Sequence, residues 1–399
     1  MLSPTRILWL RVLGLAAMQG AITLTWVIYG TYLPKMLVQF GFAAGFAAVI
    51  IIVEQALAII FEPLFGAFSD RTQQFIGNRF PFIALGVILS SALFITLPTI
   101  AILGNPQQVW RWLLPGFAVA WAIAMTMFRS PAMALLWQAV PRQKFPQATG
   151  ILIFVSGLIG AFKPIIQDNI LKLGSAFTFT IGSFTLLGAA FFLRRLYPPQ
   201  PPQQDEVTPQ QLQHLSFAKL GFVCLAGIGI AWGLRSLLPT VAAALTRNLG
   251  ESQTNSGMFI FSIILAFASI PGGIFASRVG NSSAMLIGLG VTTILLPILA
   301  FAPNFFLVAI ALLILTFVFS LVLNGTIPLA LSSVPPSRGG LGIGTYFGGF
   351  GAGMSLFSIM AGQVELTTIG QVVIGAISFL LAGVSISMMP NGNGKPYND

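Results

Sequence analysis

The sequence has 399 residues, of which 56% are hydrophobic and only 7% are charged, and its mean hydropathy is +0.90. Soluble domains carry about 25% charged residues, so this composition excludes an ordinary soluble protein and indicates one that lies in a lipid bilayer. The single cysteine, Cys224, excludes an intramolecular disulfide and a cysteine-based metal site, and we expect neither a metal nor a cofactor.

About twelve apolar runs follow one another along the chain. Each is long enough to cross a bilayer, which takes about 20 residues. Every backbone polar group must find a partner inside the lipid, so these runs are predicted to be helices rather than open strands. The first run is longer than the core of a cleaved signal peptide and is expected to remain as a helix. The runs cover residues 9–34, 43–68, 80–104, 110–137, 146–169, 174–194, 217–243, 253–277, 282–302, 305–333, 340–364 and 367–389.

One long polar segment, residues 194–217, separates the first six runs from the last six. Its proline and glutamine residues disfavour a helix and are typical of an extended, solvated linker. We therefore expect an all-α membrane protein with twelve transmembrane helices in two pseudo-repeated halves, residues 1–193 and 218–399, joined by a cytoplasmic linker at 194–217.

The two halves also resemble each other in sequence. The end of the second run and the end of the eighth share a pattern, which pairs Gly66, Asp70 and Arg71 with Gly273, Ser277 and Arg278. A second constant offset pairs Val140, Pro141, Gly150 and Gly157 with Val334, Pro335, Gly344 and Gly351. Two repeated halves with a binding site between them are typical of secondary transporters, and chance similarity among glycine-rich helices is the alternative.

The excess of basic residues indicates an orientation in the membrane. If both termini are cytoplasmic, most Lys and Arg residues fall in cytoplasmic loops, among them Arg71, Arg79, Arg142 and Arg338. Such an excess is typical of the cytoplasmic loops of membrane proteins. The net charge of +10 is therefore interpreted as the topology signal of a multi-pass protein in the plasma (inner) membrane, and not as a site for nucleic acid.

The loop after the second run carries a motif of glycine, aspartate and arginine. It consists of Gly66, Asp70, Arg71, Gly77 and Arg79, and it resembles the signature loop of the major facilitator superfamily. Its flanking residues make it look like the version in sucrose/proton symporters and in glycoside–pentoside–hexuronide:cation symporters; they are Pro63, Ser69, Pro81, Phe82 and Ile83. The resemblance implies the major facilitator fold over essentially the whole chain and transport of a solute by alternating access.

A second segment supports this resemblance. Residues 128–135, in the fourth run, are similar to a signature of bacterial sucrose-symporter-like proteins. Those relatives usually carry an aspartate tied to proton coupling near the end of this motif, where this chain has Gln138. The resemblance therefore implies a cation-coupled sugar symporter, and Gln138 argues against the usual form of coupling.

The chemistry of the signature loop indicates a conformational role. Gly66 allows neighbouring helices to approach closely. Asp70 can accept hydrogen bonds from the free amides at a helix start, or pair with an arginine of the next helix. Such contacts would break and re-form as the halves rock, so the five motif residues are predicted to form a conformational switch. The alternative is that Arg71 and Arg79 only hold the loop on the cytoplasmic side.

Five ionisable residues lie within the apolar runs: Glu54, Glu62, Arg129, Lys163 and Arg235. Inserting a charged side chain at the centre of the membrane costs about 2.5–3.5 kcal/mol of free energy, and such a side chain usually faces the interior of the bundle. Glu54 and Glu62 are the candidates for binding a coupling cation, either H⁺ or Na⁺. Glu62 and Pro63 resemble the Asp-Pro of melibiose-type symporters, whose aspartate helps to bind that cation. The alternative for Glu62 is an ion pair with Arg71 or Arg79.

The three intramembrane cations are predicted to line a substrate cavity or to neutralise the two acids. Their formal excess over the acids would favour an anionic substrate, whereas a neutral sugar would need an aromatic platform and amide or hydroxyl partners. The candidates for the substrate cavity are Arg129, Gln138, Lys163, Trp232, Arg235 and Asn324.

The sequence therefore predicts a secondary active transporter, not an enzyme, which works as a monomer and moves a small sugar- or glycoside-like solute together with a proton or Na⁺. Three alternatives stay open. They are an organic-anion or sugar-acid permease or exchanger without proton coupling, a membrane assembly factor that transports nothing, and a protein that moves lipids or amphiphiles.

Overall fold

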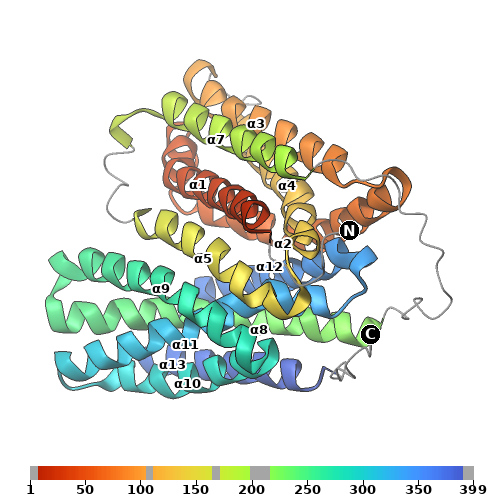
Figure 1. The fold of residues 1–399 in the computed structure, drawn as a ribbon. Coiled ribbons are helices and arrows are strands. Elements are labelled where there is room, and N and C mark those ends of the chain that lie inside the picture. Colours follow the sequence, from red (N-terminus) through yellow and green to blue (C-terminus); the bar gives the residue numbers. More distant parts are fainter. Residues whose placement is uncertain (1–7, 105–110, 164–170, 198–215, 390–399) are drawn as a thin grey trace, which may run out of the picture.

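The computed structural model describes residues 8–104, 111–163, 171–197 and 216–389, which form twelve long α-helices (Figure 1). The N-terminal group of helices consists of α1 (Trp9–Gln39), α2 (Phe46–Ile76), α3 (Phe80–Leu103), α4 (Leu113–Ala134), α5 (Phe145–Ala161) and α7 (Ser175–Leu196). The C-terminal group consists of α8 (Phe217–Leu249), α9 (Glu251–Val279), α10 (Asn281–Phe301), α11 (Phe305–Ser332), α12 (Gly339–Gln363) and α13 (Thr368–Ser387). Short 3-10 turns lie at η2 (Leu135–Gln138), η3 (Arg142–Lys144) and η5 (Pro336–Arg338).

The observed helices confirm the predicted all-α membrane fold in number and order. Eleven of the helices in the described residues are long and apolar enough to cross a membrane, and the twelfth is the glycine-rich α12. The run predicted at 146–169 is shorter in the structure, since α5 ends at Ala161. Residues 164–170 and most of the predicted linker, 198–215, lie outside the described residues.

The residues between α2 and α3 explain the tight corner that joins these two helices. Gly77 ends α2 with a φ of +73°, a left-handed conformation that glycine adopts without strain. The next helix begins at Phe80, with Pro81 in its first turn, where the missing amide hydrogen costs no hydrogen bond. This tight corner keeps the end of α2 and the start of α3 at the same end of the bundle.

The two groups of helices meet along two long contacts, which Figure 1 shows near the middle of the molecule: α2 packs on α12, and α5 packs on α9. Between α2 and α12 the backbones almost touch. A Cβ atom on Gly66 would lie 2.2 Å from the carbonyl oxygen of Gly340, and one on Gly344 would lie 2.2 Å from that of Glu62. Only glycine permits this approach, as in other closely packed membrane helices.

The α5–α9 contact has the same construction. A Cβ atom on Gly273 would lie 2.6 Å from the carbonyl oxygen of Pro146, and one on Gly150 would lie 2.5 Å from that of Ser269. The offsets found in the sequence relate the two contacts. The pair of Gly66 with Gly340 corresponds to the pair of Gly273 with Pro146, and the pair of Glu62 with Gly344 corresponds to the pair of Ser269 with Gly150. The weak sequence repeat therefore corresponds to two similar helix–helix interfaces on either side of the molecule.

Contacts join the two groups towards both ends of these interfaces. Towards one end, the Ser355 hydroxyl donates a hydrogen bond to the carbonyl oxygen of Ile52 at 3.3 Å, and the ring of Phe162 packs against that of Phe259.

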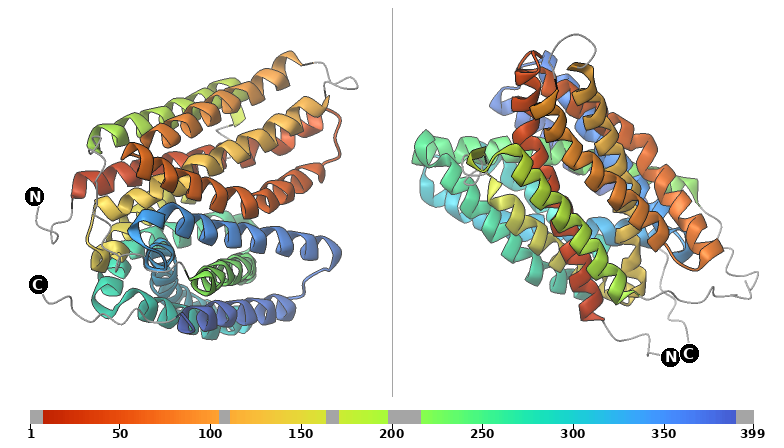
Figure 2. Two further views of the ribbon diagram at one scale, coloured as in Figure 1. Left: turned by 90° about the vertical axis from the view of Figure 1, so that its right-hand side faces the viewer. Right: turned by 90° about the horizontal axis from the view of Figure 1, so that it is seen from above.

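The opposite end, which carries Asp70, Gln147 and Leu341, is here called the Asp70 end; α1 begins and α13 ends on this side (Figure 2). At this end, hydrogen bonds join the two groups through Asp70, Arg142 and Gln147. The structure is therefore closed at the Asp70 end.

Candidate functional site

Glu62 and Arg129 form an ion pair between α2 and α4. Glu62 is fully buried and accepts hydrogen bonds from the Arg129 guanidinium, one of them from Nε at 2.9 Å, and from the Ser130 hydroxyl. The Arg129 guanidinium also lies 4.2 Å from the ring centre of Phe347 on α12, in a cation–π contact. Both carboxylate oxygens of Glu62 are thus occupied, and its charge is neutralised. The predicted alternative, a pair with Arg71 or Arg79, is wrong, because the ion-pair partner of Glu62 is Arg129.

Glu54 lies two turns earlier on α2 in a different environment. Its side chain is 4% exposed, and one carboxylate oxygen accepts a hydrogen bond from the Tyr29 hydroxyl of α1. The other oxygen, Oε2, is buried and has no hydrogen-bond partner among the described residues. The Tyr29 ring packs against Trp121 and Trp26, with ring centres 4.3 and 5.7 Å away. No ion pair with a described Lys or Arg residue compensates this acid.

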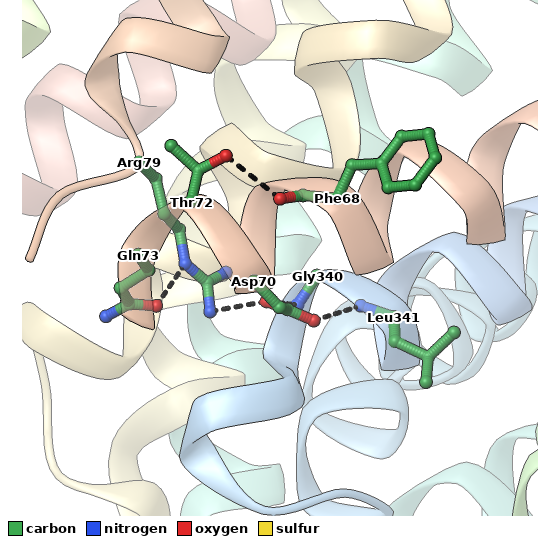
Figure 3. A network of polar contacts seen from close by, with 7 residues as sticks. All are labelled: Phe68, Asp70, Thr72, Gln73, Arg79, Gly340 and Leu341. Atoms are coloured by element: carbon green, nitrogen blue, oxygen red, sulfur yellow. Dashed lines mark hydrogen bonds and ion pairs between the residues drawn. The ribbon is translucent and has the colours of Figure 1, made fainter. Parts of the chain in front are cut away.

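Asp70 joins the two groups of helices (Figure 3). Its carboxylate accepts hydrogen bonds from the backbone amides of Gly340 and Leu341, at 2.9 and 2.8 Å, and lies 2.6 Å from Nη2 of Arg79. The amides belong to the first turn of α12, where free N–H groups and the helix dipole favour an anion. Both contacts considered for Asp70 from the sequence are therefore present at once.

Arg79 is held on its other side by Gln73, whose side-chain oxygen accepts a hydrogen bond from Nε (Figure 3). Burial lowers the pKa of Arg79, whereas the Asp70 carboxylate acts in the opposite direction. Arg71, by contrast, is exposed, and Gly77 contributes the corner between the helices. Within the signature loop, Gly66, Asp70 and Arg79 thus make the contacts, and Arg71 faces outward.

A neutral version of this arrangement lies at the equivalent place in the other interface. The Ser277 hydroxyl, which corresponds to Asp70, accepts a hydrogen bond from the amide of Gln147 at 3.2 Å. Gln147 corresponds to Leu341 by the sequence offset. One contact between the groups is therefore charged and bidentate, and its counterpart is a single neutral hydrogen bond.

Asn324 and Gln138 lie in different surroundings. The Asn324 amide is buried on α11 and donates to the carbonyl oxygen of Ser269 at 2.7 Å, while its own oxygen lacks a partner among the described residues. Gln138 lies in the turn after α4, at the Asp70 end, where its backbone oxygen accepts a hydrogen bond from Arg11. Gln138 is therefore remote along the helix from Arg129, with which it had been grouped.

The remaining candidates lie elsewhere. Lys163 is exposed directly after the end of α5. Trp232 packs edge-on against Phe357, with ring centres 5.7 Å apart. Arg235 is exposed in a pocket between α8 and the end of α12. The five intramembrane charges thus form one ion pair, one acid–tyrosine pair and two separate cations, rather than a single cluster.

Several partners were not identified from the sequence. Ser130 and Phe347 complete the surroundings of Glu62 and Arg129, and Ser277 meets Gln147. The constant offset between the halves was the available signal for the last pair, because it places residue 147 where residue 341 lies in the other half. The described residues contain no group of three or more His, Cys, Asp or Glu side chains arranged to hold a metal ion.

Comparisons with known proteins agree with this fold. The family model described as "Major Facilitator Superfamily" matches residues 15–358, whereas curated protein sequences give no match. The human organic anion transporter MFSD10 (TETRAN) is 13% identical, with a TM-score of 0.69, and the alignment covers 95% of this chain and 98% of that chain. A bacterial homologue of the iron transporter ferroportin in an outward-facing state is 16% identical, with a TM-score of 0.70 and coverages of 96% and 98%. The transporter FucP in its outward conformation is 12% identical, with a TM-score of 0.73 and coverages of 94% and 97%.

Proposed function

Because this chain belongs to the Major Facilitator Superfamily, whose members are transporters rather than enzymes, we propose that it is a symporter that moves a sugar- or glycoside-like solute together with a proton or Na⁺ bound at Glu54. The observation that carries the proposal is the contrast between two acids on one helix. Glu62 is neutralised by Arg129, but Glu54 has, among the described residues, only the neutral Tyr29 as a hydrogen-bond partner.

An acid without a compensating cation in lipid is stable when it binds a proton or a metal cation. Glu54 meets this condition, and its free Oε2 atom offers the binding position. Glu62 does not meet it, since Arg129 and Ser130 already occupy both oxygens. Of the two candidates for coupling, Glu54 is therefore the better one, and Glu62 is assigned to holding α2 against α4.

The same contrast favours a neutral substrate over an anion. Arg129 is the intramembrane cation that lies between α2 and α4, and Glu62 neutralises it. Polar atoms without partners among the described residues include Oε1 of Gln19, Nε1 of Trp26 and Oδ1 of Asn324. Unpaired donors and acceptors of this kind suit the hydroxyl groups of a sugar. Transport of an organic anion or sugar acid is the second candidate.

The contacts at the Asp70 end support an orientation in the membrane and a conformational state. The Asp70 end is assigned to the cytoplasm, because Arg71, Arg142 and Arg338 all lie there. With hydrogen bonds joining the groups at this end, the structure represents a state that is closed towards the cytoplasm, of a protein in the plasma (inner) membrane. Opening towards the cytoplasm then requires Asp70 to leave the start of α12.

Uptake into proteoliposomes tests the coupling. Radiolabelled sucrose, melibiose and glucuronate are supplied with an inward proton gradient, an inward Na⁺ gradient or neither. One gradient is expected to drive accumulation of a neutral sugar. Glu54→Gln is expected to abolish accumulation but to retain exchange of labelled for unlabelled sugar, because the binding site and the switch remain.

The matched control is Glu251→Gln, which removes an exposed acid at the start of α9. It is expected to leave both accumulation and exchange unchanged. Accumulation by Glu54→Gln at the wild-type level would assign coupling to another residue, and uptake that ignores both gradients would rule out symport. Preference for glucuronate over both sugars would support the second candidate instead.

A further inference from the structure

The outer part of α8 carries a charged pocket that the transport proposal does not use. The pocket has a volume of about 430 Å³ and lies between α8, the end of α12 and the start of α13. This volume is in the range of small-molecule sites, which is about 300–1,000 Å³. Its lining includes Arg235, Leu238, Pro239, Phe357, Glu365 and Gln371.

Arg235 is the unusual member of this lining. It lies well inside the sequence of α8, about 21 Å from the nearer helix end at about 1.5 Å per residue. Its guanidinium lies 5.6 Å from the ring centre of Phe357 but forms no ion pair with any acid among the described residues, although Glu365 lines the same pocket. Arg235 is exposed beside the loop between α12 and α13, and an arginine can hold a carboxylate or phosphate through two parallel hydrogen bonds.

The rest of the pocket is mostly apolar. Leu234, Leu238, Pro239, Val364 and Leu366 supply aliphatic surface around the arginine. Gln371, from the first turn of α13, adds an amide. A ligand that fits this lining has one anionic group at Arg235 and an apolar body along α8, and the carboxylate of Glu365 disfavours a second negative charge.

We propose that this pocket is a separate binding site for a singly charged amphiphile, with a carboxylate or phosphate group held by Arg235 and an apolar body against Leu238 and Pro239. The site is distinct from Glu54 and from the Glu62–Arg129 pair. The ligand comes either from solution or from an anionic lipid of the bilayer, since both present the same chemistry to the pocket.

A cysteine reporter tests the site in the full chain. Cys224 is the single native cysteine, so Cys224→Ala with Leu238→Cys leaves one thiol, in the pocket wall. The protein is placed in nanodiscs of phosphatidylcholine, and its labelling by a fluorescent maleimide is followed with increasing phenylbutyrate. Phenylbutyrate is expected to slow labelling, while the neutral phenylbutanol leaves the rate unchanged. A Phe306→Cys reporter, exposed at the start of α11, is expected to show no effect of either compound.

Charge variants identify the group that binds. Arg235→Gln is expected to raise the half-protecting concentration of phenylbutyrate about tenfold or more, and Arg235→Lys to restore part of the loss. Glu365→Gln is expected to lower it about twofold to threefold, since a like charge is removed. Weaker protection by phenylbutyrate in Glu365→Gln would show that Glu365 supports anion binding and would contradict the assigned charge pattern, and protection by phenylbutanol equal to that by phenylbutyrate would overturn the proposal.

A second set of labelling measurements distinguishes a ligand that comes from solution from a lipid of the bilayer. Nanodiscs that contain phosphatidylglycerol, without added phenylbutyrate, are expected to protect Leu238→Cys if the ligand is a lipid, and to leave it reactive if it comes from solution. No protection in either arm, or protection that Arg235→Gln leaves unchanged, overturns the site. The readout is labelling and not uptake, so its failure leaves the coupling role of Glu54 standing, and the reverse also holds.

Discussion

Two glutamates on α2, eight positions apart in the sequence, show how a partner decides what an acid does in a membrane. Glu62 meets Arg129 and Ser130, whereas Glu54 meets Tyr29. The first acid is part of the structure, because its charge is satisfied by another helix. The second retains an unsatisfied oxygen, which is the property that a reversible cation site needs.

The first prediction concerns the stability of the Glu62–Arg129 pair. Arg129→Gln leaves a fully buried carboxylate without its cation, and breaking such a pair costs about 3–5 kcal/mol. The double variant Glu62→Gln with Arg129→Gln removes both charges and is expected to be more stable than Arg129→Gln alone. Thermal unfolding in detergent at a fixed scan rate measures both, with Glu251→Gln as the exposed control. Additive losses in the double variant would show that the two residues do not act as a pair.

These partners mark the limit of what the sequence predicts at this scale. The apolar runs identify Glu54, Glu62 and Arg129 as intramembrane charges, because lipid makes any charge conspicuous. Which acid meets which cation depends on helix packing over a separation of 67 positions between Glu62 and Arg129. No local pattern encodes that distance, so the sequence favoured one shared cavity where the structure has separate pairs.

At the scale of the element, the sequence predicts the order of the helices, but it predicts only in part which helices pack against each other. Length and hydropathy define each span, and the glycines of α12 indicate close packing without naming the neighbour. The structure shows that the neighbour is α2, with Gly66 against Gly340 and Gly344 against Glu62. The glycines of α12 that face α2 recur every three or four positions, and this spacing places them along one side of the helix.

The second prediction follows from that contact. Gly344→Ala adds a Cβ atom that would lie 2.2 Å from the carbonyl oxygen of Glu62, so the helices must separate. Overpacking of this kind costs about 1–3 kcal/mol, and the apparent melting temperature is expected to fall. Gly290→Ala on α10 is the matched control: its Cβ atom meets nothing within 4 Å, and alanine is the better helix former by up to about 1 kcal/mol. Equal melting temperatures for the two variants would contradict the role of close packing.

At the scale of the whole molecule, the two interfaces are similar in backbone and different in charge. The sequence repeat predicted similar halves, and the pairing of Gly66 with Gly340 and of Gly273 with Pro146 is its physical form. The charged contact of Asp70 lies on one interface, and the neutral contact of Ser277 lies on the other. Of the charged contacts that break when the Asp70 end opens, the buried one therefore lies at α12, whereas the hydrogen bond from Arg142 to Ser332 is exposed.

The third prediction measures this asymmetry. Spin labels at Gln74→Cys and Val279→Cys, in a Cys224→Ala background, report the distance between the two groups at the Asp70 end, where both positions are exposed. Asp70→Asn weakens the two charge-assisted hydrogen bonds from α12, which amounts to about 2 kcal/mol and shifts the ratio of open to closed molecules about 30-fold. The ion pair to Arg79, which is also lost, lies within the N-terminal group of helices. Ser277→Ala loses one neutral hydrogen bond, about 1 kcal/mol, and is expected to shift the ratio only about fivefold. In both cases the long-distance population grows, because each variant removes contacts made only in the closed form.

Equal shifts in the two variants would show that charge does not distinguish the interfaces, and an unchanged distribution in Asp70→Asn would show that the Asp70 contact does not hold this end closed.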